Sequence, residues 1–113
     1  MPVLISISNQ LSDEDVMVTG TEAKQPKIVC DHGTVTCIDY QLPAASNTDI
    51  INKHIKITAG EKLWYLAVDS SGQVLKKDMD RNPVFWMNWP NKTDQGIEVF
   101  KWNDGTVDIR VAA

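Results

Sequence analysis

The amino-acid sequence predicts an all-β fold: a single-domain antiparallel β-sandwich of roughly eight to ten short strands. Three observations predict it. Apolar and polar residues alternate with a period of two in most segments, turn-forming residues interrupt the chain at short intervals, and no segment carries a helical apolar stripe over three turns. The chain has 113 residues, close to the commonest size of one domain, so we expect residues 1–113 to form a single β-sandwich domain.

The first part of the chain predicts two hairpins. Residues 3–9 read VLISISN and residues 16–20 read VMVTG, and both runs suit half-buried strands. The acidic turn between them predicts that these two strands pair with each other. Residues 27–40 contain two β-rich runs around His32 and Gly33. Because glycine tolerates the positive φ of a tight turn, we expect a second hairpin there.

The second part of the chain predicts one irregular segment followed by further strands. Residues 41–53 are polar, contain Pro43 and break the β pattern, with room for one short helical turn after Ser46 or Asn47. Strands are then expected at 54–58, 63–69, 74–78, 84–89, 97–102 and 106–111. The last two strands form the clearest hairpin, because the loop Asn103-Asp104-Gly105 suits a short connection between strands.

The charge of the chain bears on its partners. The composition is 42% hydrophobic and 23% charged, with a formal net charge of −4. A nucleic-acid-binding protein normally presents a basic face to the phosphates, so we expect no nucleic-acid partner. Strong attraction to anionic lipids is not expected either, whereas neutral lipid head groups are compatible with this charge.

The N-terminal stretch and the lengths of the apolar runs bear on the cellular location of the protein. No apolar run reaches the roughly 18 residues that a membrane-spanning helix needs. The N-terminal stretch MPVLISISNQ lacks the basic region and the long apolar region of a secretory signal. We therefore expect a soluble protein, either cytoplasmic or released without a visible signal peptide, and the sequence leaves the compartment open.

The two cysteines allow two structural roles. Cys30 and Cys37 close a short loop, and a disulfide between them is possible in an oxidising compartment. In a reducing compartment they are small apolar side chains. His32 lies between them, but a zinc site needs four ligands at recognisable spacings, which the sequence lacks. We expect no metal and no cofactor.

Enzymatic activity receives little support from the sequence. His32 and His54 lie outside recognised catalytic motifs, and the acidic residues fall mostly in expected turns. We therefore expect a binding protein without catalytic activity.

The aromatic residues carry the functional prediction. In residues 84–89, VFWMNW, strand alternation places Phe85, Met87 and Trp89 on one face and Val84 and Trp86 on the other. A sandwich sheet has one inner face, so one of the two sets needs other cover or is exposed. Bulges or a homodimer interface are two ways to cover it, and exposed aromatic patches commonly mark binding surfaces.

Within this segment we expect different side chains to play different roles. Pro90 ends the predicted strand, because proline cannot continue a central ladder. We therefore expect Phe85 and Met87 to be buried and Trp86 and Trp89 to contact a ligand. The full set of candidate ligand-binding residues is Trp64, Tyr65, Trp86, Asn88, Trp89, Asn91, Lys92 and Asp94.

Three segments together resemble the aegerolysin family of small acidic β-sandwich proteins. They are VLISISNQLSDEDVMVTG, HIKITAGEKL and VFWMNWPNKTDQGIEV, which occur in the family's order and cover less than half of the chain. The region from Cys30 to Asn52 has no counterpart, and the chain is shorter than is usual in that family. The resemblance implies recognition of membrane lipids, sphingolipids or sterol-containing domains, and in some members a toxin-like pore-forming partner. It also implies that Trp86 and Trp89 contact the membrane or a lipid head group.

Two other binding functions fit the same residues. The aromatic rings can stack on a sugar, as in a lectin, with Asn88, Asn91 and Asp94 supplying hydrogen bonds. Alternatively, the aromatic loop can insert into a protein partner, as in an inhibitor or immunity protein, because tryptophan is enriched at the energetic centres of interfaces. The sequence favours the lipid function and leaves the other two open.

Overall fold

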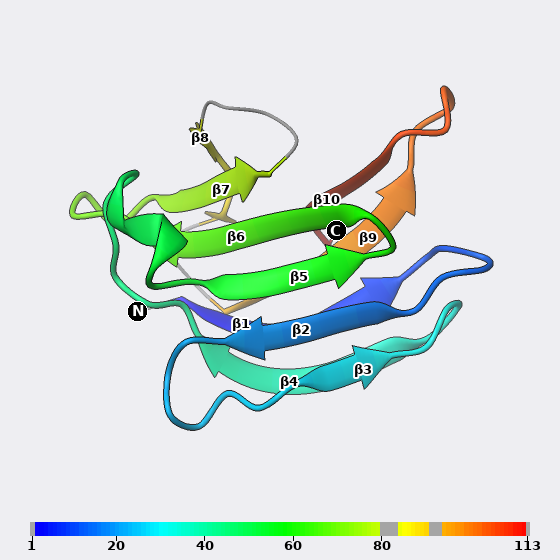
Figure 1. Ribbon diagram of the computed structural model, residues 1–113, viewed down its shortest axis with the longest axis horizontal. Helices are drawn as coiled ribbons and strands as arrows, with labels where there is room; N and C mark the ends of the chain where they lie inside the picture. Colours follow the sequence, from blue (N-terminus) through cyan, green and yellow to red (C-terminus); the bar gives the residue numbers. More distant parts are fainter. Residues whose placement is uncertain (1, 80–83, 91–93, 113) are drawn as a thin grey trace.

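The computed structural model describes residues 2–79, 84–90 and 94–112. In this part of the chain, ten strands form two packed sheets (Figure 1). The four-stranded sheet has the order β10 (Val107–Val111), β9 (Gln95–Lys101), β1 (Val3–Asn9), β4 (Val35–Gln41). The six-stranded sheet has the order β3 (Ile28–Cys30), β2 (Val16–Gly20), β5 (Ile55–Ala59), β6 (Lys62–Val68), β7 (Val74–Asp78), β8 (Val84–Trp86). The predicted all-β sandwich is confirmed.

Both predicted N-terminal hairpins are wrong, because their strands belong to different sheets. Strand β1 pairs with β4 and β9, whereas β2 pairs with β3 and β5. The buried side chain of Asn9 stabilises this crossing: its amide nitrogen donates to the carbonyl oxygens of Glu14 at 2.9 Å and Cys30 at 3.0 Å. Its amide oxygen accepts a hydrogen bond from the Leu11 N–H. The acidic segment is therefore a connection between the sheets.

The pairing of β1 with β9 is parallel, in contrast to the antiparallel arrangement that was predicted throughout. Ile7 aligns with Ile97 and Asn9 with Val99 in this ladder. The predicted hairpin of the last two strands is confirmed, because β9 pairs with β10 antiparallel. Strands β5 with β6 and β6 with β7 also pair antiparallel. Gly105, with φ of 88°, adopts the left-handed conformation in the last hairpin loop.

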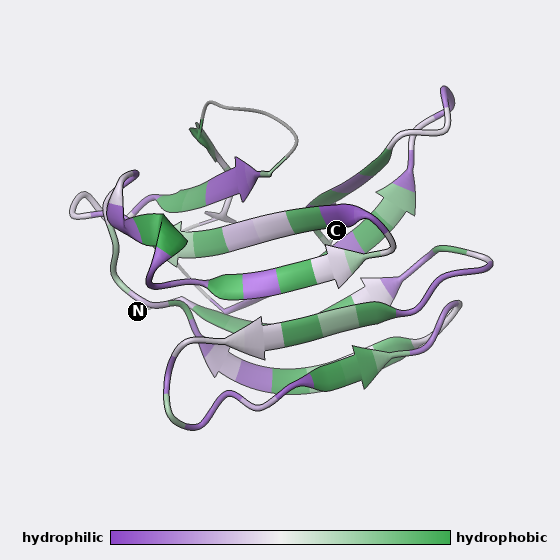
Figure 2. Cartoon of the chain, in the orientation of Figure 1, coloured by the Kyte–Doolittle hydropathy of each residue, from purple (hydrophilic) through white to green (hydrophobic). Residues whose placement is uncertain are grey.

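The main core lies between the two sheets. On strand β6, every second side chain points toward the opposite sheet and is buried there: Trp64, Leu66 and Val68. Along β5, Ile55 and Ile57 are buried and Lys56 between them is half-buried. Figure 2 shows the matching alternation of apolar and hydrophilic residues along this strand. Within the described residues, no helix is both long and apolar enough to cross a membrane.

A second, smaller cluster lies on the outer face of the six-stranded sheet. Ala45 and Ile50, from the segment after β4, pack on Ala67 and Leu75. This segment contains the single turn of 3₁₀ helix η1 (Asp49–Ile51), so the predicted helical turn is confirmed. It is attached to the end of β6 by two hydrogen bonds of 2.9 Å, from the Ala45 N–H to Val68 O and from the Val68 N–H to Pro43 O. The segment covers part of the apolar outer face.

Of the two roles that the sequence left open for the cysteines, the structure shows no disulfide, and the two residues lie on different sheets. Cys30 ends β3 and is buried, with its thiol 3.5 Å from the carbonyl oxygen of Ile7. Cys37 lies on β4 and is exposed. Both are free thiols.

Candidate functional site

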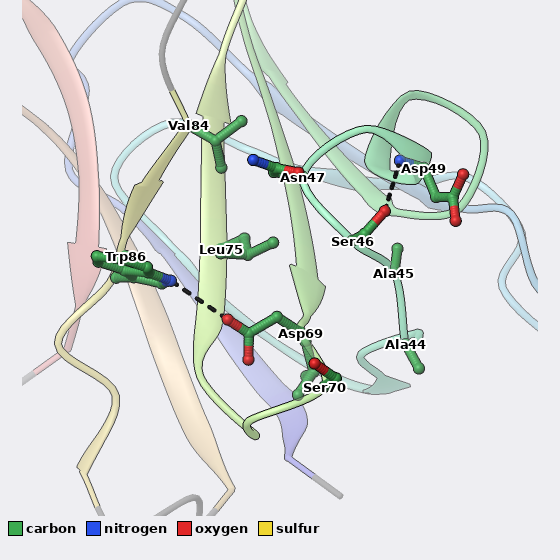
Figure 3. Close-up of a pocket in the computed structure, with 11 residues that line it drawn as sticks. Ala44, Ala45, Ser46, Asn47, Asp49, Asp69, Ser70, Leu75, Val84 and Trp86 are labelled. Carbon is green, nitrogen blue, oxygen red and sulfur yellow. Dashed lines mark hydrogen bonds between the residues drawn. The ribbon is translucent and has the colours of Figure 1, made fainter.

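A pocket of about 460 Å³ opens on the outer face of the six-stranded sheet, beside the segment that carries η1. Trp86 of β8 forms one side, and the turn around Ser46 and Asp49 forms the other (Figure 3). Leu75 of β7 and Val84 of β8 lie between them and supply an apolar floor. The volume lies within the range of about 300–1,000 Å³ that is typical of small-molecule sites.

Trp86 presents a large, fixed aromatic surface. Strand pairing places it opposite Leu75, on the outer face of the sheet, and 68% of its surface is exposed. Its indole N–H donates a hydrogen bond of 3.3 Å to Asp69 Oδ2 (Figure 3). An exposed tryptophan whose N–H is already paired offers a ligand mainly its ring face.

Asp69 is fixed by the turn between β6 and β7. Its Oδ1 accepts hydrogen bonds from the Ser71 N–H at 3.0 Å, the Ser71 hydroxyl at 2.7 Å and the Gln73 N–H at 2.9 Å. The hydroxyl of Ser71 is the main reason why the pKa of Asp69 lies below its usual value, with the other donors and Trp86 adding to it. Asp69 is therefore a negatively charged acceptor at neutral pH.

The pocket wall opposite Trp86, formed by the turn around Ser46 and Asp49, is anchored by the packing and hydrogen bonds of neighbouring residues. Ile50 is buried in the second cluster, and the carbonyl oxygen of the same residue accepts a hydrogen bond of 2.7 Å from His54 Nδ1. The His54 ring stacks on Tyr65, with their centroids 3.7 Å apart. Within the turn, Ser46 Oγ accepts a hydrogen bond from the Asp49 N–H at 3.1 Å (Figure 3). These contacts make the wall part of the folded domain.

The pocket combines an aromatic face and an apolar floor with a polar rim. The polar lining residues are Ser46, Asn47, Asp49, Asp69 and Ser70. The lowered pKa of Asp69 does not suit a general acid, which needs a pKa near the working pH. Nowhere in ranges 2–79, 84–90 and 94–112 do three or more His, Cys, Asp or Glu side chains gather as a metal site.

The structure separates the predicted ligand-binding residues. Trp86 and Asn88 are exposed and line one pocket together. Asp94 is exposed just before β9. Asn91 and Lys92 lie outside the described residues.

Three aromatic candidates are covered by the protein itself. Trp64 is fully buried in the main core, and Trp89, with 9% of its surface exposed, belongs to the same core cluster. The prediction that they contact a ligand is therefore wrong, because core packing covers both rings. Tyr65 is half-buried and packs against the second cluster and His54. Phe85 and Met87 were both predicted to be buried. Met87 does pack on the core, but Phe85 is 44% exposed at the sheet edge.

The polar rim of the pocket was not predicted from the sequence. Ser46, Asn47 and Asp49 were assigned to an irregular segment, Asp69 was placed at the end of the strand expected at 63–69, and Ser70 lies between two expected strands. The available signal was the length of residues 41–53, since long loops within compact domains are commonly functional. The approach of Asp69 to Trp86 depends on the pairing of β7 with β8, which no local pattern encodes.

The comparisons with known proteins supply no relative: no family model, curated protein or solved structure matches the chain. The function of the protein is therefore inferred from the geometry of the pocket and its surroundings.

Proposed function

We propose that the protein is a non-catalytic carbohydrate-binding protein and that the pocket beside Trp86 binds a sugar ring. The observation that carries this proposal is the position of Trp86: a 68%-exposed ring forms the wall of a pocket with hydrogen-bonding groups on its opposite rim. A sugar has one apolar face of C–H groups and a periphery of hydroxyl groups. The ring and the apolar floor suit the face, and the polar rim suits the hydroxyl groups.

The groups on the rim suit hydroxyl ligands in particular. Asp69 offers a charged acceptor, and charge-assisted hydrogen bonds are stronger than neutral ones. Ser46 and Ser70 can donate or accept, and the Asn47 amide can do both at once. Because Asp69 and the wall around Asp49 are held by internal hydrogen bonds, little ordering is needed on binding.

The lipid function predicted from the aegerolysin resemblance uses the same tryptophan. Tryptophan does suit a lipid–water interface. Inserting Trp86 would bring the Asp69 carboxylate, which is hydrogen-bonded to it, toward the apolar region, and removing a charge from water is costly. This is why the pocket favours a sugar, and why vesicles belong in the test.

The test is a glycan array probed with the wild-type protein, Trp86→Ala and Trp86→Phe, with Val35→Ala as the control. Val35 is an exposed apolar residue on β4, at the opposite side of the sandwich. We expect wild type and Val35→Ala to bind the same glycans, Trp86→Ala to lose at least about fivefold in affinity, and Trp86→Phe to retain part of it.

Two outcomes would overturn the proposal. One is an empty array, and the other is binding that Trp86→Ala leaves unchanged. Tryptophan emission with sphingolipid–sterol vesicles is recorded in parallel. A blue shift that is lost in Trp86→Ala, together with an empty array, would replace the sugar by a membrane lipid.

A further inference from the structure

Trp86 also lines a second pocket, on the other side of β8. This pocket of about 470 Å³ lies between the edge strands β8 and β10, which belong to different sheets. Phe85, Met87 and Asn88 line it from the β8 side, and Arg110 and Val111 line it from β10. Trp86 is therefore a shared wall between the first pocket and this second one.

A third pocket continues the same groove. It has a volume of about 290 Å³ and shares Phe85 and Lys76 with the second pocket. Its far end is lined by Trp102, from the loop between β9 and β10. Three pockets in succession thus share side chains, and an exposed aromatic ring lies at each step: Trp86, then Phe85 at 44% and Trp102 at 50% exposure.

The groove has a fixed floor and a fixed far end. Lys76 of β7 donates to Asp108 of β10 at 3.1 Å and lies 3.5 Å from the carbonyl oxygen of Ile109, so it links the two sheets. The indole N–H of Trp102 donates to Asp108 Oδ2 at 3.1 Å. The Trp102 ring also contacts the Phe100 ring edge-on, with centroids 4.8 Å apart. The last aromatic surface is therefore held in position before any ligand arrives.

The charges along this path disfavour an anionic ligand. The carboxylates that line the three pockets are Asp49, Asp69, Asp78, Asp104 and Asp108. Among the described lining residues the cations are Lys76 and Arg110. Lys76 is ion-paired with Asp108, and Arg110 with Glu98. Both cations already have internal partners, so they are poorly placed to compensate a charged ligand.

We infer that the sugar-binding pocket extends over β8 into the groove between β8 and β10, and that the whole path binds an extended, uncharged oligosaccharide. The inference rests on the proposed function. Successive aromatic rings suit the repeating apolar faces of a sugar chain, and the polar groups between them suit its hydroxyl groups. Each additional sugar unit adds contacts without a second cost of association, so affinity increases with chain length.

The experiment measures affinity against chain length by titration calorimetry. The probes are malto-, cello- and N-acetylchito-oligosaccharides of one to six units, with oligogalacturonates of equal length as charged counterparts. We expect affinity in a neutral series to increase with length and oligogalacturonates to bind at least about tenfold more weakly. Phe85→Ala and Trp102→Ala should weaken the six-unit probe by at least about fivefold and leave the shortest binding probe unchanged.

The controls separate this inference from the proposed function. Trp102→Phe keeps a ring at the far end and should retain most of the six-unit affinity, and Val35→Ala should match wild type. Affinity that is independent of length, or insensitive to Phe85→Ala and Trp102→Ala, would overturn the extended site and leave the single-sugar pocket in place. Absence of binding to all neutral series would overturn the inference, and the glycan array decides the proposed function separately.

Discussion

Ile50 and Ile51 are neighbours in the same turn of η1 and offer a matched test of the second cluster. The Ile50 side chain is fully buried against the outer face of the six-stranded sheet, whereas Ile51 is 53% exposed. Replacing each with alanine removes the same atoms from the same helical turn. Any difference between the two variants therefore reports the packing of Ile50 under the pocket wall.

The expected magnitude follows from burial. Truncation of a buried isoleucine to alanine costs about 2–5 kcal/mol in free energy of unfolding. Ile50 belongs to a surface segment that can settle into part of the cavity, so we expect the lower part of this range, about 2–3 kcal/mol. Ile51→Ala should change the stability by less than about 0.5 kcal/mol, as exposed substitutions generally do.

Urea unfolding followed by circular dichroism measures the difference. With a dependence on urea of about 1–3 kcal/mol per molar, Ile50→Ala should lower the midpoint of unfolding by about 0.7–3 M. Because Ile50 supports the wall formed by Ser46 and Asp49, this variant should also weaken glycan binding at low urea. Equal effects of the two substitutions, or a loss below about 0.5 kcal/mol for Ile50→Ala, would refute the role of the second cluster.

Two further predictions concern His54 and the thiols. Burial lowers the pKa of His54 and the charge of Lys56 lowers it further, whereas the hydrogen bond to Ile50 O acts in the opposite direction. As pH falls, His54 is therefore protonated in the unfolded chain before it is protonated in the folded chain. The free energy of unfolding should therefore decline below about pH 6.5, and His54→Phe should flatten this part of the curve; parallel curves would contradict the assignment. In native protein, a thiol reagent should modify Cys37 rapidly and Cys30 only after denaturant is added, since Cys30 is buried; two fast thiols, or none, would contradict the structure.

The period-two pattern predicted the strands well but not which strands pair. Local alternation is imposed by burial on one face, so Trp64, Leu66 and Val68 could be placed together from the sequence. The partner of a strand is a long-range property. The two wrong hairpins arose because turn residues near Asp13 and Gly33 are compatible both with a hairpin and with a crossing between sheets.

The aromatic segment shows the same limit at the site. Alternation had placed Trp89 on the same face as Met87, and in the structure Trp89 is buried in the core and Met87 packs against it, partly buried. The inference from Pro90 that Trp89 faces outward was wrong, because the strand ends at Trp86 and the chain then turns inward. Trp86 was correctly placed on the opposite face to Met87, but its neighbour Asp69 could not be foreseen, since their contact depends on tertiary structure.

The parallel pairing of β1 with β9 has a consequence for how the chain folds during its synthesis. Ile7 aligns with Ile97, about ninety positions later, so this ladder closes a very long loop. At a synthesis rate of about 5–20 residues per second, β1 waits about 5–20 s for its neighbour to emerge from the ribosome. The strands β5, β6 and β7 are consecutive hairpins and can form during that time. Until then one edge of β1 is unpaired and open to other chains, so the yield of folded protein should fall when synthesis is slow or when many chains are made close together.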